Sequence, residues 1–406
     1  MKLTPVLILA AMATFSCGPS KKAAESTPAA DGTVAPVTDV IPASRGEVMK
    51  KPDVDVEKVE FYMNFLKTAL EGSPAGNTVL SPYSAGMAFS MLTDGAKGKT
   101  RESLVQALSR SAFYGDNLYS DSLNIVKSAN SIWLNRGFKA KDGYIGNLTN
   151  GYCAQVYSAD AGDPFTAEAV NSWCGKHTEG LISHILDEIP VDTRMMLLNA
   201  LYFKAPWLIP FSKDDTFKET FHGEAGDAEV DFMHKSSRSY GYALLPGCKV
   251  VNLPYKNNRY AMLVAIPDDM DKVVSHLDVI EFQNALSRLR RGDEVVLSLP
   301  RFKVEYTGVL NGIMEKLGAG DALTPGADFS GITDESVFVT SALQKCVLEV
   351  NEEGSEAAVV TAILVGRTSV AVQRPPVVIK VDRPFLFAIY DTKTQNILFE
   401  GKIADI

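Results

Sequence analysis

The sequence lacks the features that define several large classes of protein. No apolar run in its 406 residues approaches the roughly 20 residues that a membrane-spanning helix needs. Its five cysteines are too few and too scattered for a disulfide framework. Acidic residues outnumber basic ones, and the net charge of −9 argues against nucleic-acid binding, which requires a basic face.

Motifs of enzyme chemistry are missing as well. The chain has no G-x-S-x-G, no H-E-x-x-H and no Walker-type loop. Its five histidines show no metal-ligand spacing with cysteine. Gly318 and Gly320 form a G-x-G that follows a predicted helix, so we interpret it as a helix cap and turn. We therefore expect no catalytic residue, no metal site and no cofactor.

The cysteines beyond the N-terminal region are scattered along the chain. We predict that they are buried free thiols rather than disulfide partners, because unpaired cysteine behaves as a small hydrophobic residue. They are Cys153, Cys174, Cys248 and Cys346.

The first residues have the pattern of a targeting segment. Lys2 precedes an apolar stretch at 6–13, which is too short to span a bilayer. Cys17 follows at the distance found in the lipobox of bacterial lipoproteins, although Thr14 and Phe15 depart from the usual pattern. We predict a lipoprotein-type signal peptide over 1–16 with lipid attached to Cys17, and an ordinary secretory signal is the alternative. The mature protein would then be exported to the cell envelope, in the periplasm or at the cell surface.

A segment of unusual composition follows. Residues 18–54 contain no aromatic residue and five prolines, and Ala, Thr and Ser fill much of the remainder. Such a segment cannot bury enough apolar surface to offset the entropy lost on ordering. We predict a flexible tether over 17–54 that links the lipid to a folded domain over 55–406.

Hydrophobic periodicity predicts helices and strands in an irregular order. Helical spacing of apolar residues covers 56–70, 84–92, 100–108, 165–181, 274–289 and 309–317. Strand-like runs cover 131–134, 195–203, 294–306 and 341–350, with three short runs in 240–267 and three more in 377–403. The apolar run at 195–203 predicts a strand buried on both faces. Because helices dominate early and strands late, we predict an α+β fold.

One segment near the C-terminus, 351–373, has a distinctive composition. Ten residues without a charge separate Glu356 from Arg367, and small or β-branched side chains dominate. Strand alternation gives one face with no charge and nothing larger than isoleucine. That face holds Ser355, Ala357, Val359, Thr361, Ile363 and Val365. An ordinary buried strand would explain this composition, but the strands predicted on either side leave little chain for connections.

The sequence resembles the serpin family in several separated blocks. EEGSEAA at 352–358 is similar to the hinge at the start of the family's reactive-centre loop, and DRPFLF at 382–387 matches the family signature. Further blocks occur in family order: LSPYS at 80–84 after Asn77, NALYFK at 199–204 before Trp207, LPRFK at 299–303 and DFSGI at 328–332. The resemblance covers about residues 56 to 406 and predicts one serpin domain.

The resemblance implies both a fold and a mechanism. The serpin fold has a central mixed β-sheet with further sheets, about eight to nine helices, and an exposed reactive-centre loop, here about 352–376. Serpins are suicide-substrate inhibitors of serine proteases, and some inhibit cysteine proteases. The protease forms an acyl-enzyme with the loop, which then inserts as a new strand of the main sheet.

The hinge decides whether such insertion is possible. Inward-facing residues that insert must be small and uncharged, because an unpaired buried charge costs several kcal/mol. The inward-facing residues Ser355, Ala357, Val359 and Thr361 meet that demand, and the hinge contains no proline, so we predict an active inhibitor. The hinge residues are Glu353, Gly354, Ser355, Glu356, Ala357 and Ala358. A non-inhibitory serpin-fold binding protein is the alternative.

The resemblance leaves the reactive bond open. Family spacing from Gly354 indicates the bond Thr368–Ser369. Arg367 stands one residue earlier and suits trypsin-like enzymes, whose specificity pocket carries a buried carboxylate. Val365 would suit an elastase-like enzyme and ranks behind. The expected partners are therefore trypsin-like or elastase-like serine proteases. We predict that the protein is a monomer, contacts membranes only through a lipid on Cys17 and binds no nucleic acid.

Two further sets of residues match family positions that control insertion. Ser81, Ser84 and Asn199 match the polar "shutter" under the main sheet, where Gln344 replaces the family's usual histidine. Glutamine can donate and accept hydrogen bonds, but it does not titrate near neutral pH. Trp207 matches the "breach" where the loop first enters the sheet, which is also compatible with a plain core aromatic.

Overall fold

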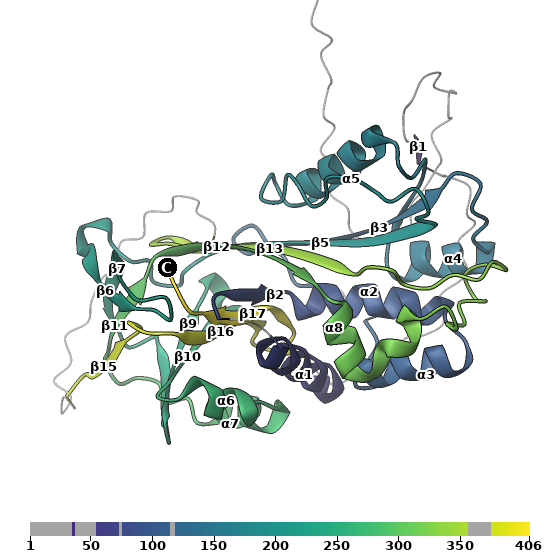
Figure 1. Ribbon diagram of the computed structural model, residues 1–406. Coiled ribbons are helices and arrows are strands. Elements are labelled where there is room, and N and C mark those ends of the chain that lie inside the picture. Colours follow the sequence, from purple (N-terminus) through teal and green to yellow (C-terminus); the bar gives the residue numbers. More distant parts are fainter. Residues whose placement is uncertain (1–34, 37–53, 73–74, 114–117, 356–374) are drawn as a thin grey trace, which may run out of the picture. The chain divides into compact units, whose positions relative to one another are not determined.

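A computed structural model describes residues 35–36, 54–72, 75–113, 118–355 and 375–406 (Figure 1). The predicted signal peptide and most of the predicted tether lie outside these residues, as does the loop segment 356–374. Two residues of the predicted tether form a short strand, β1 (Ala35–Pro36), which pairs antiparallel with β4 (Gln155–Ala159).

Three β-sheets form the framework of the described chain. The main sheet has the order β1, β4, β3 (Ile125–Asn135), β5 (Met195–Pro206), β14 (Gly354–Ser355), β13 (Leu343–Val350), β12 (Phe302–Val309). It is mixed, because β3 runs parallel to β4 and antiparallel to β5. The six-stranded sheet has the order β2 (Thr78–Leu80), β17 (Ile397–Ile403), β16 (Phe385–Asp391), β10 (Tyr260–Pro267), β9 (Cys248–Pro254), β8 (Gly241–Leu245). The four-stranded sheet has the order β15 (Val377–Lys380), β11 (Val295–Pro300), β7 (Asp227–Ser237), β6 (Thr216–His222).

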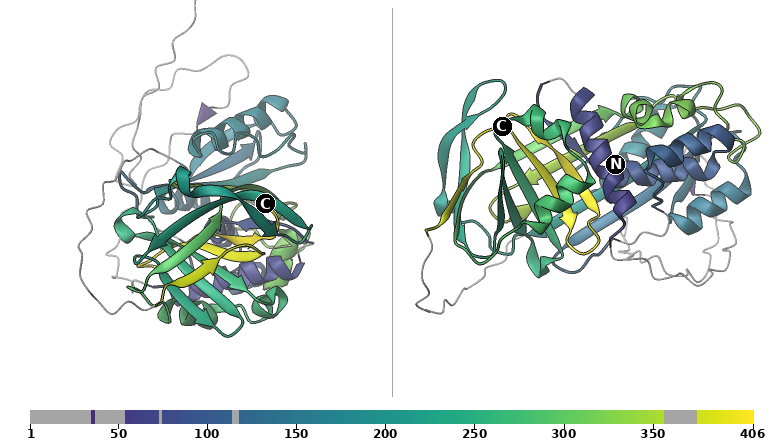
Figure 2. Two further views of the ribbon diagram at one scale, coloured as in Figure 1. Left: turned by 90° about the vertical axis from the view of Figure 1, so that its left-hand side faces the viewer. Right: turned by 90° about the horizontal axis from the view of Figure 1, so that it is seen from below.

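The described chain contains eight α-helices, placed on both sides of the main sheet. They are α1 (Val56–Gly72), α2 (Pro82–Gly95), α3 (Gly98–Ala107), α4 (Asp142–Gly151), α5 (Pro164–His177), α6 (Met270–Ser275), α7 (Val279–Ser287) and α8 (Asn311–Met314). Figure 1 shows α5 on one face of the main sheet, with α1, α2, α3 and α8 on the other. Seen from below, α1, α6 and α7 cross the six-stranded sheet (Figure 2).

Helix α2 lies in the core and positions several polar residues beneath the main sheet. Ser81 is its N-cap, and the Ser81 hydroxyl accepts the N–H of Ser84. Pro82 occupies the first turn, where its missing N–H costs no helical hydrogen bond. The helix packs against both β5 and β17, so it links the main sheet to the six-stranded sheet.

Most of the predicted elements are confirmed. The predicted helices at 56–70, 84–92 and 100–108 correspond to α1, α2 and α3, and the strands at 131–134, 195–203 and 341–350 correspond to β3, β5 and β13. The three short runs at 240–267 are β8, β9 and β10, and those at 377–403 are β15, β16 and β17. Gly318 has a φ of 99°, the left-handed conformation expected of the predicted turn.

Four predicted elements differ from the structure. The predicted helix 309–317 starts in β12, which ends at Val309, and its α-helical part is only α8, followed by a π-helical turn over Glu315–Ala319. Helix α5 ends at His177 rather than at 181, because Glu179 and Gly180 adopt left-handed conformations with φ of 52° and 86°. The predicted helix 274–289 is two helices, since Asp278 caps a new one by accepting the N–H of Glu281. The predicted strand 294–306 is divided at Arg301, where the chain leaves the four-stranded sheet and enters the main sheet.

The cysteines follow the prediction with one exception. Cys174, Cys248 and Cys346 are free and buried. Burial raises the pKa of the Cys174 and Cys248 thiols to about 11 and that of Cys346 to about 12, so all three stay protonated at neutral pH. The prediction is wrong for Cys153, which is disulfide-bonded. Cys153 is exposed in a turn after α4, so it lacks the core packing on which the prediction rested.

Candidate functional site

The main sheet is divided between its two central strands, β5 and β13. Strand β14 occupies one end of this division, with Gly354 opposite Pro206 of β5 and Ser355 opposite both Ala205 of β5 and Val350 of β13. Beyond Ser355 no ladder joins β5 to β13, both of which lie wholly within the described chain. We call this division the gap.

The gap explains why one strand prediction is wrong. The run at 195–203 was expected to be buried on both faces, but residues 195–199 are only partly buried. Full burial begins at Ala200, closer to the end that β14 fills. A continuous apolar run is typical of a strand that is buried on both faces. Here residues 195–199 have no paired strand among the described residues on the side that faces β13.

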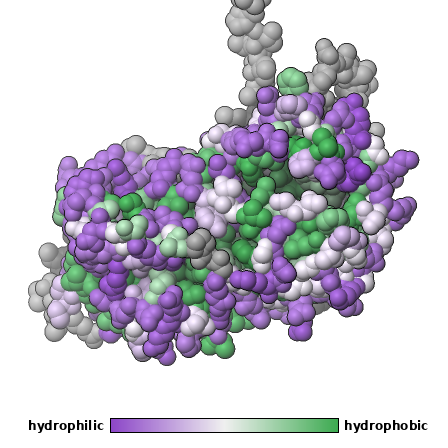
Figure 3. All heavy atoms as spheres, viewed as in Figure 1, coloured by the Kyte–Doolittle hydropathy of each residue, from purple (hydrophilic) through white to green (hydrophobic). Residues whose placement is uncertain are grey.

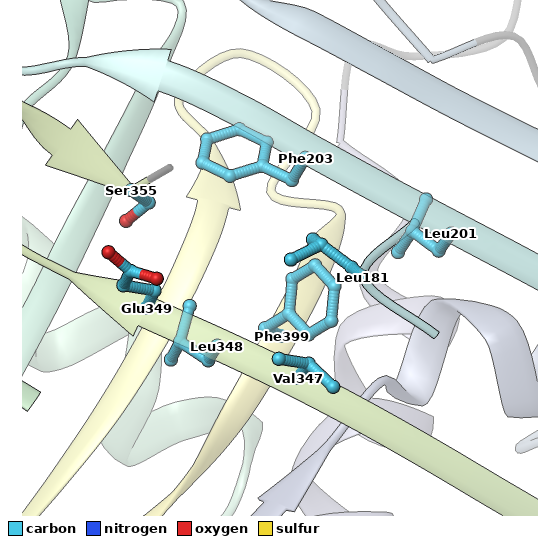
Figure 4. A pocket seen from close by; sticks show the side chains of 8 residues that line it. All are labelled: Leu181, Leu201, Phe203, Val347, Leu348, Glu349, Ser355 and Phe399. Carbon is cyan, nitrogen blue, oxygen red and sulfur yellow. The ribbon is translucent and has the colours of Figure 1, made fainter. Parts of the chain in front are cut away.

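A small cavity of about 20 Å³ lies directly ahead of Ser355 (Figure 4). Its walls are mostly apolar side chains from both flanking strands, with Phe399 of β17 beneath and Leu181 from the segment after α5, and Glu349 of β13 also lines it. The apolar strand residues are Leu201, Phe203, Val347 and Leu348. The space suits small side chains that continue the line of β14.

A second cavity, of about 60 Å³, continues the gap toward the other end of the strands. Leu181, Ile182 and Ile185 cover it from the segment after α5, and the space-filling view shows a hollow lined largely by apolar residues below α5 (Figure 3). The shutter residues named from the sequence all line this cavity. They are Ser81, Ser84, Asn199 and Gln344.

The structure brings the four shutter residues together as two hydrogen-bonded pairs. On the β13 side, Gln344 Oε1 accepts the N–H of Ser81 at 3.0 Å and Gln344 Nε2 donates to the Ser81 carbonyl at 2.8 Å. On the β5 side, the Ser84 hydroxyl donates to Asn199 Oδ1. The backbone and amide groups that surround the gap are thereby satisfied without the titratable histidine usual in the family.

Sequence reasoning missed one member of this network. Asn199 Nδ2 donates to Asn130 Oδ1 at 2.8 Å, and Asn130 Nδ2 donates to the carbonyl of Tyr152 at 2.8 Å. Asn130 lies on β3 directly opposite Asn199. No recognised block covers that part of β3, so only the strand register could have pointed to it.

Trp207 lies at the breach, as the resemblance implied. Its indole Nε1 donates to the Asn351 carbonyl at 2.9 Å, and its backbone N–H donates to the Glu353 carbonyl at 2.8 Å. The chain immediately before β14 is therefore fixed to the end of β5 by both the side chain and the backbone of one residue. Trp207 is also buried, so it serves as a core aromatic residue as well as a contact of the hinge.

Tyr255 is a second residue that sequence reasoning missed. Its ring stacks on Trp207 with a centroid separation of 4.4 Å and an interplanar angle of 11°. The Tyr255 hydroxyl lies 2.6 Å from Ser355 Oγ, and both groups are buried. Burial raises the pKa of Tyr255, which keeps the phenol neutral and able to bond the serine. A neutral hydrogen bond of this kind contributes about 1 kcal/mol.

Gly354 is required by the close approach of β14 to β5. A Cβ atom on Gly354 would lie 2.2 Å from the Ala205 carbonyl oxygen and 2.7 Å from Pro206 Cα. Both neighbours are backbone atoms of a paired strand, so they cannot move aside cheaply. The glycine thus permits the hinge to enter the sheet.

A charged pair closes the same end of the gap. Glu352, whose side chain is only 5% exposed, has Oε1 3.8 Å from a guanidinium nitrogen of Arg301. Arg301 also bonds Asp231 of β7 at 3.0 Å. The buried carboxylate therefore has a compensating charge at the point where three elements meet.

The remaining site residues named from the sequence lie outside the described residues. They are Glu356, Ala357, Ala358, Val365, Arg367, Thr368, Ser369 and the N-terminal Cys17. Of the hinge, the structure describes Glu353, Gly354 and Ser355.

Metal binding and membrane spanning were the other classes of function considered from the sequence, and the described residues show the features of neither. No three His, Cys, Asp or Glu side chains among them could together hold a metal ion. No helix in the same part of the chain is long and apolar enough to cross a membrane.

Comparison with known proteins identifies the family. A family model described as serpin, serine protease inhibitor, matches residues 57–406. The chain belongs to the serpin family. Among curated serpins, Iripin-2 of Ixodes ricinus is 34% identical over 360 residues, which cover 83% of this chain and 90% of Iripin-2. The leukocyte elastase inhibitor of Sus scrofa is 29% identical over 369 residues, covering 85% of this serpin and 97% of that protein.

Solved structures agree with this assignment. The native state of the thermophilic serpin tengpin has a TM-score of 0.80 and 26% identity, covering 90% of this chain and 97% of tengpin. The predicted serpin fold, of α+β class with a central mixed sheet, is therefore confirmed. The family consists in general of protease inhibitors rather than enzymes, which makes proteases the expected kind of partner.

Proposed function

We propose that this serpin is a suicide-substrate inhibitor of serine proteases that acts by inserting its cleaved loop into the gap. One observation carries the proposal: two hinge residues, Gly354 and Ser355, already pair as a strand between β5 and β13, and the gap continues ahead of them. A gap between two strands whose facing backbone groups are unpaired is a site where a further strand can add, and backbone hydrogen bonds then supply the affinity.

The register of β14 predicts how the loop would fit. Continuing its pairing would bring Ala357 opposite Phe203 and Thr361 opposite Asn199 on β5. The pairing with β13 would bring the same Thr361 opposite Gln344. The methyl group of Ala357 would then lie beside the 20 Å³ cavity, and the hydroxyl of Thr361 would lie beside the polar shutter residues. This agreement between side-chain type and surroundings supports insertion in the same register.

The length of the gap bears on the reactive bond. In this register Val365 would be opposite Met195, the first residue of β5, so loop residues 356–365 would fill the gap. The bonds after Arg367 and after Thr368 lie just beyond that point. Cleavage at either would free a segment long enough for the whole gap, so we rank these two bonds together, with cleavage after Val365 behind.

The chemistry requires nothing from the serpin except a correctly presented loop. The protease's catalytic serine would attack the carbonyl of the reactive bond, releasing a new amine on the C-terminal fragment and leaving an ester to the N-terminal part. Insertion of residues 356–365 would then carry the esterified protease away from its docking position before water completes the reaction.

Incubation with trypsin and with elastase tests the proposal. We expect a covalent complex that survives denaturing electrophoresis, together with a released C-terminal fragment. The mass of that fragment identifies the bond, because it begins at Thr368, at Ser369 or at Gly366 after cleavage following Arg367, Thr368 or Val365. Trypsin-like preference predicts Thr368 as the first residue of the fragment.

The same experiment can overturn the proposal. If no tested protease forms a complex, and if cleavage of the loop leaves the melting temperature unchanged, the chain does not insert its loop. The non-inhibitory, serpin-fold binding protein would then be the better description.

We further infer that the protein is exported and that Cys17, where its sulfur is not engaged in a disulfide, carries a lipid that holds the protein at the cell envelope. The apolar stretch at 6–13 and the position of Cys17 after it support this inference. A protease inhibitor held in this way would act on proteases that reach the cell surface or periplasm.

A further inference from the structure

A row of polar side chains crosses the outer four-stranded sheet, one from each strand. Lys380 of β15 is opposite Ser298 of β11, and Ser298 is opposite His234 of β7. Glu219 of β6 lies opposite Val230 of β7, out of register with this row, and its side chain extends to His234. We call Lys380, Ser298, His234 and Glu219 the β15 clamp.

Contacts along the row join one edge of the sheet to the other. Ser298 Oγ lies 3.0 Å from His234 Nδ1, and His234 Nε2 lies 2.9 Å from Glu219 Oε1. The other carboxylate oxygen of Glu219 lies 2.8 Å from the Lys380 ammonium. Phe217 stacks on the imidazole with a centroid separation of 4.1 Å and an interplanar angle of 9°. Because His234 Nε2 has no hydrogen-bond partner among the described residues, the imidazole only lies beside the carboxylate, and the ion pair with Lys380 is the contact that holds Glu219.

The strand at one end of the row is the shortest of its sheet. Strand β15 has four residues, lies at the sheet edge and pairs only with β11. At its two ends the N–H of Val377 donates to the Glu294 carbonyl at 2.8 Å and that of Val381 donates to the Ser298 carbonyl at 2.9 Å. These bonds add to the ladder that pairs β15 with β11 over four positions, and a strand this short at a sheet edge opens more readily than a central strand.

We propose that the β15 clamp positions the C-terminal root of the reactive loop by holding β15 in its sheet. Strand β15 begins directly after the predicted loop, so it is the loop's C-terminal attachment to the fold. The ion pair of Glu219 and Lys380 links β15 directly to β6, although β11 and β7 lie between these two strands in the sheet. The role in loop presentation rests on the proposed inhibitory function, whereas the attachment of β15 does not.

Hydrogen exchange in the uncleaved protein tests the attachment without any protease. Glu219→Gln and Lys380→Met should each speed exchange of the Val377 and Val381 amides about two- to fivefold, the range expected for a partly exposed ion pair. The double variant should exchange no faster than either single variant, because both changes remove the same pair. Lys380→Arg retains the charge and should exchange nearly as slowly as the unmodified protein.

The same strands offer a matched control on another ion pair. Lys218 of β6 bonds Asp231 of β7 at 3.1 Å without touching β15, so Lys218→Met should leave β15 exchange unchanged. The proposal is overturned if neither Glu219→Gln nor Lys380→Met speeds exchange, if Lys218→Met has an equal effect, or if the two single effects add. Because no protease is present, these results stand whether or not the chain inhibits one.

Discussion

At the scale of single residues, Ser355 shows how narrow the tolerance of the gap is. Its side chain is 1% exposed, and its hydroxyl is held 2.6 Å from that of Tyr255. Neighbouring Gly354 has no room for a methyl group. The hinge thus enters the sheet only with residues that are small and uncharged.

Replacing Ser355 by arginine should turn the inhibitor into a substrate. A guanidinium at this position would be buried beside Trp207 and Tyr255 without a carboxylate partner, at a cost of several kcal/mol. The loop would remain cleavable but would insert too slowly to trap the enzyme. Electrophoresis after incubation with protease should show cleaved serpin, with the covalent complex reduced more than about tenfold.

Ser355→Ala is the matched control for that substitution. It removes the hydrogen bond to Tyr255, worth about 1 kcal/mol, but stays small and uncharged. We expect this variant to trap protease with little loss. Persistent trapping by Ser355→Arg would contradict the insertion account at its first residue.

Glu400 is a residue whose position the inhibitory mechanism does not explain. It lies on β17 between Leu80 of β2 and Ala388 of β16 and is completely buried. Neither carboxyl oxygen has a hydrogen-bond partner among the described residues. Burial therefore raises the pKa of Glu400 well above its usual value, and the folded protein holds this group protonated.

Charged and phenolic groups on the packed elements have other partners. Tyr62 of α1 donates to Asn396, Tyr390 of β16 donates to Asn252, and Asp391 pairs with Arg259. Lys58 of α1 lies over the ring of Phe113 at 4.8 Å from its centroid. None of these contacts involves the Glu400 carboxyl group, so none of them stabilises its ionised form.

The stability of the fold should therefore decline as pH rises. The unfolded chain releases the Glu400 proton near pH 4.3, whereas the folded chain keeps it, so above that pH the folded state binds the extra proton. The free energy of unfolding should fall by about 1.4 kcal/mol per pH unit until the folded-state pKa is reached. Urea unfolding at pH 5, 6 and 7 measures this slope.

Glu400→Gln isolates this contribution. Glutamine has nearly the same shape and cannot ionise, so the variant should lose less stability between pH 5 and 7 than the unmodified protein does. Subtracting the two slopes removes the effects of all other titrating groups, among them His177, whose pKa is lowered by burial. Equal slopes for the two proteins would show that Glu400 does not hold a proton in the folded state.

At the scale of elements, the two halves of β5 differ. Residues 200–203, toward β14, are buried, whereas residues 195–199 are only partly buried. If the cleaved loop inserts, the gap-facing amides of β5 and β13 gain new partners. Their hydrogen exchange should slow at least about tenfold after cleavage, since a new ladder hydrogen bond protects each donor.

Strands outside the main sheet supply the control for that measurement. Strands β9 and β10 pair with each other in the six-stranded sheet and do not border the gap. Their exchange should be the same before and after cleavage. A uniform slowing of all strands would indicate general tightening of the fold instead of insertion.

The elements also show what the sequence could predict. Periodicity found α1 and the long strands, because each has one continuous apolar pattern. It did not reveal the passage between sheets at Arg301, since alternation continues unbroken across it. It likewise joined α6 to α7, because the N-cap Asp278 does not interrupt the apolar spacing.

For the candidate site, the sequence could not predict residues that reach the gap only through the three-dimensional fold. Family blocks predicted the shutter and Trp207, and the structure brings these residues to the same gap. Tyr255 and Asn130 lie outside the recognised blocks and reach the site only through tertiary packing and strand register. Residues that act by contact across sheets leave no local pattern to read.

At the scale of the whole molecule, the two proposed roles, inhibition by the serpin domain and anchoring by the N-terminal segment, involve different residues. The described contacts of the gap involve residues from 81 onward, and none of them comes from the predicted tether. Inhibition should therefore be independent of how the protein is anchored. This separation makes the predicted lipid attachment testable without disturbing the inhibitory machinery.

Cys17→Ala should release the protein from membranes while leaving inhibition intact. Each buried methylene of an acyl chain contributes about 0.8 kcal/mol to membrane binding, so loss of the lipid removes the anchor altogether. The unmodified protein should sediment with membranes and incorporate labelled fatty acid, whereas the variant should do neither. The variant's rate of complex formation with protease should match that of the unmodified protein, because the gap is unchanged. Membrane sedimentation of Cys17→Ala would instead favour another mode of attachment, and absence of label in the unmodified protein would favour an ordinary secretory signal.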